Sequence, residues 1–278
     1  MPACFDGHLH STASDGALDP RGLVDLVRAA GVRAFALTDH DTFAGHADAA
    51  RRATLLGLDF VPGVEMSCEL AGREIHVLAY FVTQTAAPLE DALAAARAER
   101  HAHLDRALAR LRELGVPVER DAVLRFAGAA APGRPHLARA LLAAGHVDSI
   151  DDAFKRFLAT GRPGHVPRPL PAAARMIELV RAAGGVTSAA HPGVYDMDGA
   201  TLDRLQQLGI DAVEVYHPDH SPEQRVYYLR HCERLRLLPT GGSDYHASGV
   251  GKPMPGSDGL DGPGLARLRE RHVQRTRQ

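Results

Sequence analysis

Apolar residues recur in the first part of the chain with two alternating periods, one typical of helices and the other of buried strands. Residues 19–31 begin with Asp-Pro, carry leucine and valine at helical spacing and end at a glycine, so they predict a helix. The apolar run 33–38 predicts a buried strand, and residues 46–56 and 59–62 repeat the helix and the strand. Strands and helices joined by short glycine-marked links are typical of a parallel α/β fold.

A long stretch in the middle of the chain departs from this alternation. Residues 89–114 form one amphipathic pattern rich in alanine and arginine, and helical spacing continues to about residue 161. Strand patterns return at residues 186–190, 211–216 and 238–240. So long a helical run inside an α/β chain predicts an inserted subdomain.

Composition and charge narrow the class of protein. The 278 residues carry a formal net charge of -2, which argues against binding nucleic acid mainly through charge, although a local basic patch stays open. Three widely spaced cysteines do not indicate a disulfide framework. No apolar run reaches the roughly 18 residues of a membrane span and no signal-peptide pattern opens the chain. We therefore expect a cytoplasmic protein of enzyme size, with no membrane partner and no obligate protein partner.

The first fifteen residues contain side chains with metal-binding chemistry. His8 and His10 are two apart, so in an extended strand both imidazoles point to the same face, a few residues from the carboxylate of Asp15. Nitrogen and oxygen donors of this kind bind borderline divalent cations. Alone, the His-x-His pattern is more typical of a solvated strand end, so the residues further along the chain decide between the two interpretations.

Further donors follow the later strands. His40, Glu65, His191 and the pair Asp244 and His246 each fall at or just past the carboxyl end of a predicted strand. In a (β/α) barrel this end carries the active site. With one histidine inside a strand, nine residues become candidates for a single cluster: His8, His10, Asp15, His40, Glu65, His76, His191, Asp244 and His246.

This donor set is large enough for two or three divalent ions. An ion with an open position takes three or four protein ligands, and a carboxylate such as Glu65 can bridge two ions. No cysteine joins the set, which favours Mn²⁺, Fe²⁺ or Zn²⁺ bound through nitrogen and oxygen. Mn²⁺ is the first candidate, with Fe²⁺ or Zn²⁺ as alternatives. A hydroxide that bridges two close ions is a nucleophile at neutral pH, and the ions stabilise the charge of a phosphoryl group in transfer. The cluster therefore predicts attack on the phosphorus of a phosphate ester.

The ordered motifs resemble the PHP (polymerase and histidinol phosphatase) phosphoesterases over nearly the whole chain. The motifs concerned are Asp6-Gly-His-Leu-His-Ser11 with Ser14-Asp15, Thr38-Asp-His-Asp41, Gly63-Val-Glu65, Ile75-His76, Ala190-His-Pro192 and Ser243-Asp-Tyr-His246. Within that family the chain looks closest to the branch of nucleoside 3′,5′-bisphosphate phosphatases and a related 5′–3′ exoribonuclease of short RNA. The segments similar to that branch are Arg134-Pro-His136, Phe154-Lys-Arg-Phe-Leu158 and Glu214-Val-Tyr-His-Pro-Asp-His220.

The resemblance implies a distorted (β/α)7 TIM-like barrel, the PHP fold, with a trinuclear metal centre. We expect two parts of the barrel at residues 1–99 and 166–278, with a helical insertion subdomain at residues 100–165. Residues 265–273 are expected to form a surface helix or to fray. Gly7 stands where relatives usually carry a bulkier apolar residue, a difference that could loosen the first strand.

By motif position, the resemblance also assigns ligands to three ions. The three sets are His8, His10, Glu65 and Asp244; Glu65, His76 and His191; and Asp15, His40 and His246. Asp39 and Asp41 flank a ligand and are expected to support the metal-binding histidines. His191 and His246 are further expected to act directly in catalysis, together with Arg134.

Residues outside the nine are candidates for binding substrate: Arg134, His136, Lys155, Arg168, His217 and His220. The first four belong to the insertion or flank it, and an arginine there can pair with phosphate through two hydrogen bonds. The alternative is that they cap helices or form surface ion pairs. The two remaining histidines either contact substrate or hydrogen-bond the barrel rim.

We therefore expect a phosphoesterase with two or three divalent ions that acts on nucleoside 3′,5′-bisphosphates or on the 5′ end of short oligoribonucleotides. Two alternatives stay open. One is a phosphomonoesterase of small metabolites, of the histidinol-phosphatase type. The other is a non-catalytic PHP module, which would have no need to keep all nine ligands.

Overall fold

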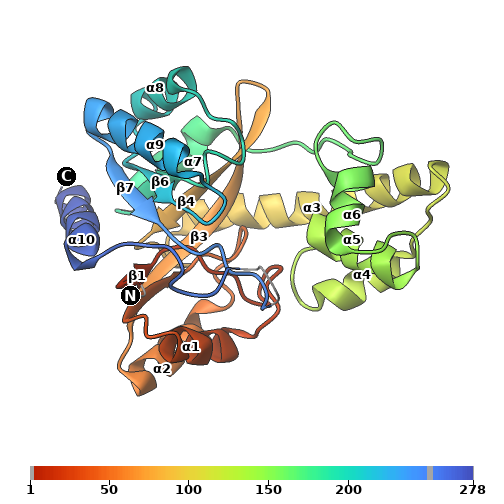
Figure 1. The fold of residues 1–278 in the computed structure, drawn as a ribbon, viewed down its shortest axis with the longest axis horizontal. Coiled ribbons are helices and arrows are strands. Elements are labelled where there is room, and N and C mark those ends of the chain that lie inside the picture. Colours follow the sequence, from red (N-terminus) through yellow and green to blue (C-terminus); the bar gives the residue numbers. More distant parts are fainter. Residues whose placement is uncertain (1–2, 249–252, 278) are drawn as a thin grey trace. The chain divides into compact units, whose positions relative to one another are not determined.

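The computed structural model describes residues 3–248 and 253–277 and contains a seven-stranded sheet in chain order (Figure 1). The strands are β1 (Phe5–Asp6), β2 (Ala34–Leu37), β3 (Asp59–Leu70), β4 (Arg73–Tyr80), β5 (Val186–Ala189), β6 (Ala212–Tyr216) and β7 (Leu238–Gly241). The backbone N–H of Gly7 donates to the carbonyl of Gly241 at 3.0 Å, and Leu9 pairs with Tyr245 in parallel. The first and last strands therefore meet, and the sheet closes into the predicted distorted barrel.

One strand departs from the parallel pattern. β4 is antiparallel to both β3 and β5, whereas the other neighbouring pairs are parallel. The cause is a tight turn at Ala71 and Gly72, which both have positive φ (53° and 80°) and connect β3 directly to β4. No helix intervenes between the two strands. β3 extends to Leu70, well beyond the predicted end at residue 62. The sequence predicts two strands in this region, but it does not indicate that they run in opposite directions.

Ten α-helices and one π-helix are found in the described residues. They are α1 (Pro20–Ala29), α2 (His46–Leu56), α3 (Ala87–Glu113), α4 (Arg120–Ala127), α5 (Arg134–Ala143), α6 (Ile150–Ala153), the π-helix η1 (Phe154–Leu158), α7 (Ala173–Ala182), α8 (Gly199–Gln207), α9 (Pro222–Leu235) and α10 (Gly262–Thr276). The predicted start of α1 is confirmed, since the Asp19 side chain accepts a hydrogen bond from the N–H of Gly22. α9 begins with a capping box between Ser221 and Gln224.

The chain divides into two compact units. The first comprises residues 1–93 and 170–278 and holds the barrel, with α7 against β5, α9 against β6 and β7, and α8 next to α9 (Figure 1). The second comprises residues 94–169 and has its own apolar core, in which Leu104, Leu111 and Leu141 are buried. Each unit therefore buries apolar side chains of its own, which is what an independently packed element requires.

The terminal helix α10 packs firmly on the barrel. Leu265 and Leu268 are buried in a cluster with Phe5 from the first strand. On the same helix, Arg271 and Arg275 donate to the buried carboxylate of Asp211 at 3.0 and 2.6 Å. Helix α10 therefore does not fray. Its apolar and charged partners come from distant parts of the sequence and hold it on the barrel.

Candidate metal centre

The carboxylate of Glu65 lies among five imidazoles. Glu65 is buried on β3, where neighbouring segments bring histidines to both of its oxygens. The Oε2 atom lies 3.1 to 3.2 Å from ring nitrogens of His8, His10 and His40. The Oε1 atom lies 2.8 and 2.9 Å from ring nitrogens of His76 and His191. A single carboxylate at the middle of five histidines is the arrangement expected of a residue that bridges cations.

The strand ends explain how distant residues meet. His8 and His10 directly follow β1, and His40 follows β2 and pairs with Glu65 in an isolated bridge. The candidate ligands His191, Asp244 and His246 follow β5 and β7, whereas His76 lies within the antiparallel β4. Parallel strands deliver their carboxyl ends to one edge of a barrel, so residues far apart in sequence converge there.

Backbone strain accompanies two of these residues. His191 and Asp244 have φ values of 27° and 50°, in the left-handed region that side chains other than glycine rarely adopt. Such conformations cost about 1–3 kcal/mol each and cluster at functional sites. Their presence at two strand ends is consistent with side chains that are held in place for a ligand.

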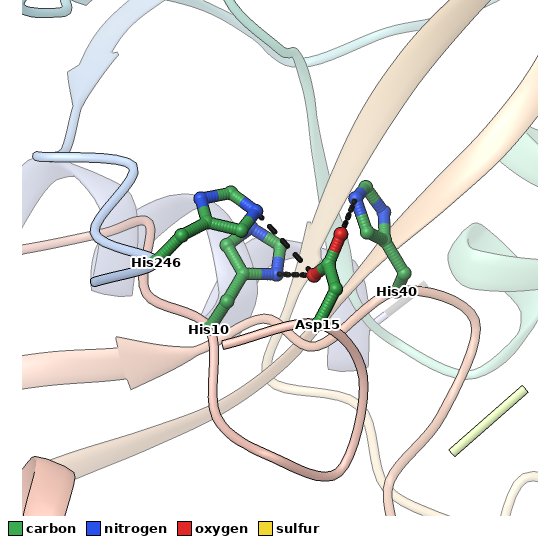
Figure 2. Close-up of side chains that lie close together, drawn as sticks. All are labelled: His10, Asp15, His40 and His246. Atoms are coloured by element: carbon green, nitrogen blue, oxygen red, sulfur yellow. Dashed lines mark ion pairs between the residues drawn. The ribbon is translucent and has the colours of Figure 1, made fainter. Parts of the chain in front are cut away.

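Two further carboxylates complete the cluster. The Oδ1 of Asp244 lies 3.2 Å from His8 Nε2 and 3.3 Å from His10 Nε2. Figure 2 shows Asp15 between His10 and His246 on one side and His40 on the other, with nitrogen–oxygen distances of 3.8, 3.4 and 3.8 Å. The cluster therefore contains three buried or half-buried carboxylates and six imidazoles.

Four groups of donor atoms lie close enough together that each could hold a metal ion. Within each group, one donor atom from every member lies within 4.8 Å of the others. The groups are His10, Asp15, His40 and His246; His8, Glu65 and His191; His8, His10 and Asp244; and His40, Glu65 and His76. Together they comprise the nine residues that the sequence nominates.

Buried atoms without a hydrogen-bond partner test whether these residues fit a cation. Five such atoms belong to the cluster: Nε2 of His8, Nε2 of His10, Nδ1 of His40, Nδ1 of His191 and Oδ1 of Asp244. Buried polar atoms in native proteins are nearly always satisfied, and leaving one unsatisfied is costly. The concentration of unsatisfied nitrogens around carboxylates fits divalent cations coordinated by nitrogen and oxygen.

The pKa values of the clustered side chains also favour bound cations. Against the effect of burial, the neighbouring carboxylates of Asp244 and Glu65 raise the pKa of His10 to about 10. Burial lowers the pKa of His40 to about 3. The neighbouring imidazoles outweigh burial and hold the pKa of the Glu65 carboxyl well below its usual range. The site therefore retains negative carboxylates and draws positive charge towards them, a charge that cations can supply in place of protons.

Glu214, in β6, belongs to a segment quoted for the family resemblance, but the sequence analysis gave it no role in the site. Its Oε1 lies 3.0 Å from Nδ1 of His8, and its Oε2 accepts a hydrogen bond from the backbone N–H of His191 at 2.7 Å. The contact fixes the imidazole of His8 so that Nε2 faces the cluster. A glutamate inside an otherwise apolar, buried strand was the available signal in the sequence.

Asp6 supports the cluster from β1. Its carboxylate accepts hydrogen bonds from the backbone N–H and hydroxyl of Ser243 at 3.0 and 2.7 Å and from the N–H of Gly256 at 2.8 Å. Burial raises the pKa of Asp6 to about 6, partly offset by these hydrogen bonds. Asp6 thereby ties the strand before His8 to the residue before Asp244.

The two aspartates beside His40 hold neighbouring loops. The carboxylate of Asp39 accepts hydrogen bonds from the hydroxyls of Ser11 and Ser14, both at 2.6 Å, and so anchors the loop that carries Asp15. The carboxylate of Asp41 accepts from the N–H of Ser67 at 3.2 Å. Their contacts are with the loop and strand that carry the candidate ligands.

His217 and His220 differ in what they contact. Nε2 of His217 lies 3.4 Å from Oδ2 of Asp244, which puts its ring at the edge of the cluster. His220 uses both ring nitrogens on the backbone, Nδ1 with the carbonyl of Val215 at 2.9 Å and Nε2 with the N–H of Gly193 at 3.0 Å. Of these two histidines, His217 lies next to a candidate ligand, Asp244.

The other predicted substrate-binding residues belong to the second unit: Arg134, His136, Lys155 and Arg168. Arg134 is the first residue of α5, and His136 is buried with its Nδ1 accepting a hydrogen bond from the N–H of Gly133 at 3.0 Å. Lys155 lies in η1. Their role towards a substrate stays a prediction.

Across the described residues, no helix combines the length and the apolar character needed to cross a membrane.

Alignments with known proteins cover most of this chain. The family model of the PHP domain matches residues 6–160. A 3′,5′-nucleoside bisphosphate phosphatase of Chromobacterium violaceum is 34% identical, over 90% of this chain and 89% of that protein. The 5′-3′ exoribonuclease Rnm of Escherichia coli is 33% identical, over 87% and 85%. A solved structure from Bifidobacterium adolescentis, assigned to the metal-dependent phosphoesterases, superposes with a TM-score of 0.90 at 32% identity and covers 98% of each chain.

Proposed function

Because this chain belongs to the PHP domain family and is a metal-dependent phosphoesterase, we propose that it hydrolyses nucleoside 3′,5′-bisphosphates or the 5′ end of short oligoribonucleotides. The observation that carries the proposal is the Glu65 carboxylate among five imidazoles, with unsatisfied nitrogens around it. The similarity to a bisphosphate phosphatase and an exoribonuclease supports the substrate class.

We assign the nine clustered residues as the ligands of two or three divalent ions, with Mn²⁺ the first candidate and Fe²⁺ or Zn²⁺ the alternatives. Ions held there would activate water and offset the negative charge of the phosphate under attack. Glu65, with both oxygens facing imidazoles, is the proposed bridging ligand. The supporting observation is the common location of the four donor groups.

Neighbouring groups of the chain orient two of the proposed ligands, His8 and His246. Glu214 keeps Nε2 of His8 directed at the cluster, and the Nδ1 of His246 lies 2.9 Å from the carbonyl oxygen of Asp244, which directs its Nε2 towards Asp15. His246 is 32% exposed at its side chain, which leaves it accessible to a substrate phosphate. We propose catalytic contacts for His191, His246 and Arg134.

A second phosphate distinguishes the proposed substrates from simple monophosphates. We propose that the substrate phosphates bind to Arg134, His136, Lys155, Arg168 and His217. His220, whose ring nitrogens both contact the backbone, takes the alternative role of hydrogen-bonding the barrel rim. Each charge-assisted contact contributes roughly 1.5–3 kcal/mol, so loss of one phosphate is expected to lower kcat/KM about tenfold to a hundredfold. The support for the insertion residues is their chemistry, since arginine and lysine are common phosphate ligands.

The experiment is a comparison of substrates with Mn-loaded protein. Adenosine 3′,5′-bisphosphate and a 5′-phosphorylated trinucleotide are compared with 5′-AMP, 3′-AMP and histidinol phosphate. We expect one of the first two to be hydrolysed fastest. A higher kcat/KM for histidinol phosphate or a plain nucleoside monophosphate would overturn the proposal in favour of a small-metabolite phosphatase. Absence of any hydrolysis by metal-loaded protein would favour a non-catalytic module.

A further inference from the structure

Arg225, in the first turn of α9, reaches back over the loop that precedes this helix. Its side chain donates to the backbone carbonyl of His217 at 2.8 Å through Nη2 and to that of His220 at 3.3 Å through Nε. A capping box fixes the helical turn from which the side chain extends. One guanidinium therefore holds both ends of the loop 217–220.

The third nitrogen of the same guanidinium joins this loop to a segment that follows β7. Nη1 of Arg225 lies 2.8 Å from Oδ1 of Asp258, whose side chain is 12% exposed. Two residues before Asp258, the N–H of Gly256 donates to the buried carboxylate of Asp6 at 2.8 Å. Arginine suits such a junction, because its planar fork presents several donors in a fixed geometry. Arg225 therefore connects the loop 217–220 to a segment that is anchored on β1.

The loop 217–220 carries His217, whose ring lies at the edge of the candidate metal centre. Nδ1 of His217 accepts a hydrogen bond from the backbone N–H of Asp219 at 3.2 Å, which leaves the ring proton on Nε2. Nε2 lies 3.4 Å from Oδ2 of Asp244. The other oxygen of Asp244 lies 3.2 and 3.3 Å from two of the clustered imidazoles. His217 therefore holds one oxygen of this carboxylate while the other oxygen faces the candidate ligands.

Asp244 is a candidate ligand that needs such support. Its φ of 50° lies in the left-handed region, and a strained conformation of this kind persists only where the surroundings hold it. Its side chain is 23% exposed, so close packing does not by itself fix the direction of the carboxylate. The contact with His217 supplies part of that direction, and it depends on the position of the loop 217–220.

We propose that Arg225 is a positioning residue of the metal centre, which acts through His217 to keep the carboxylate of Asp244 directed at its ion. The proposal rests on the assignment of Asp244 as a metal ligand in the proposed function. Groups that bond a metal ligand directly typically change metal affinity about tenfold to a hundredfold. Arg225 is one contact further from the ion, so its effect is expected to be smaller.

Titration of the metal-free protein with Mn²⁺ measures this effect without any substrate. For Arg225→Ala, we expect the apparent Kd of Mn²⁺ to rise about threefold to tenfold. Arg225→Lys keeps a charge opposite Asp258 but cannot bond both carbonyls, so it should recover only part of the affinity. The matched control is Arg230→Ala, an exposed arginine on the same helix, which is expected to keep the Kd of the unaltered protein. An unchanged Kd in Arg225→Ala would overturn the proposal.

A double-mutant cycle with His217→Ala separates positioning from a general structural role. If Arg225 acts through His217, the double variant should bind Mn²⁺ no more weakly than His217→Ala alone. Losses of affinity that multiply would mean that Arg225 acts through another contact, such as the one with His220, and would overturn the proposal. Urea unfolding checks that each variant is folded, and Arg225→Lys takes the place of Arg225→Ala in the cycle if the alanine variant does not fold.

Hydrolysis of a generic aryl phosphate gives a second readout. Excess metal compensates for weaker binding, so Arg225→Ala should lose kcat at limiting Mn²⁺ and regain most of it at saturating Mn²⁺. A loss of kcat that saturating Mn²⁺ does not reverse would contradict a role in metal binding.

Asp244→Asn separates failure of this proposal from failure of the proposed function. If Asp244→Asn binds Mn²⁺ as tightly as the unaltered protein, the ligand assignment fails, and the positioning role fails with it. If Asp244→Asn binds Mn²⁺ weakly while Arg225→Ala binds it normally, only the positioning role is overturned. Weaker binding in both variants, with the control unchanged, supports the role of Arg225.

Discussion

The carboxylate of Glu214 holds the imidazole of His8, with Oε1 3.0 Å from Nδ1 and both side chains fully buried. The same carboxylate accepts a hydrogen bond from the backbone of His191. Two candidate ligands that follow different strands therefore share one support. A partner of this kind sets which ring nitrogen faces the metal and how the ring is turned.

Glu214→Gln is therefore expected to weaken metal binding without removing any ligand. We expect a loss of about tenfold to a hundredfold in metal affinity, with a parallel loss of activity at limiting Mn²⁺. Metal titration followed by elemental analysis measures the effect. Glu233→Gln on the exposed face of α9 is the control, and an equal affinity in the two variants would show that Glu214 has no such role.

Glu65→Gln should be among the most damaging single substitutions, because Glu65 faces five imidazoles with its two oxygens. An amide offers one weaker donor oxygen and no charge, so we expect more than about a hundredfold loss of kcat/KM. Unaltered protein purified without chelator should hold more than one equivalent of transition metal, and the variant should hold less.

Glu69→Gln, on the same strand, is the matched control for that substitution. It should retain metal content and activity, because Glu69 lies near the hairpin turn and bonds the N–H of Gly72. A metal content at or below one equivalent in the unaltered protein would contradict a multinuclear centre. Near-normal activity of Glu65→Gln would contradict its bridging role.

The convergence of candidate ligands could be predicted from the sequence because it depends on local patterns. An apolar strand followed by a histidine or an aspartate is visible in any single segment, and the barrel geometry then brings strand ends together. His40, His191 and Asp244 were found in this way. The barrel itself was implied by the family resemblance and is confirmed by the closed sheet.

The features that sequence analysis missed depend on contacts between distant segments. The direction of β4 is set by a tight turn at Gly72 and by pairing with β3, neither of which appears in an apolar pattern. Glu214 and Asp6 stand in buried strands, but their partners lie 206 and 237 residues away. A single sequence shows that such a carboxylate is unusual, not which group it supports.

Gly7 was expected to loosen the first strand, but its surroundings leave no free space. A Cβ atom on Gly7 would stand 2.8 Å from the carbonyl oxygen of Gly241, 2.9 Å from the Phe5 ring and 3.1 Å from the Tyr80 hydroxyl. The first strand is therefore tightly packed at this glycine, where its N–H bonds to β7. The side chains of Phe5 and Tyr80 occupy the space that a larger residue would take.

Gly7→Ala is therefore expected to destabilise the protein by about 1–3 kcal/mol, because a backbone carbonyl cannot move aside without disturbing the closure of the barrel. Urea unfolding measures the change in the free energy of unfolding. The control is Gly262→Ala at the start of α10, where a Cβ atom meets nothing within 4 Å. A stability of Gly7→Ala equal to that of the control would mean that the contact is relieved at no cost.

Arg134→Ala tests whether the insertion contributes to substrate choice. If Arg134 binds the phosphate that is not cleaved, its removal should raise KM for adenosine 3′,5′-bisphosphate about tenfold or more, but change KM for a generic aryl phosphate little. The aryl phosphate has only the reacting phosphate, so it cannot lose a contact to the second one. Arg125→Ala, an exposed arginine on α4 of the same unit, is the control and should leave both KM values unchanged. Equal increases for both substrates in Arg134→Ala would instead indicate contact with the reacting phosphate or a structural role, and the selectivity for bisphosphates would then have to come from His217 and its neighbours on the barrel.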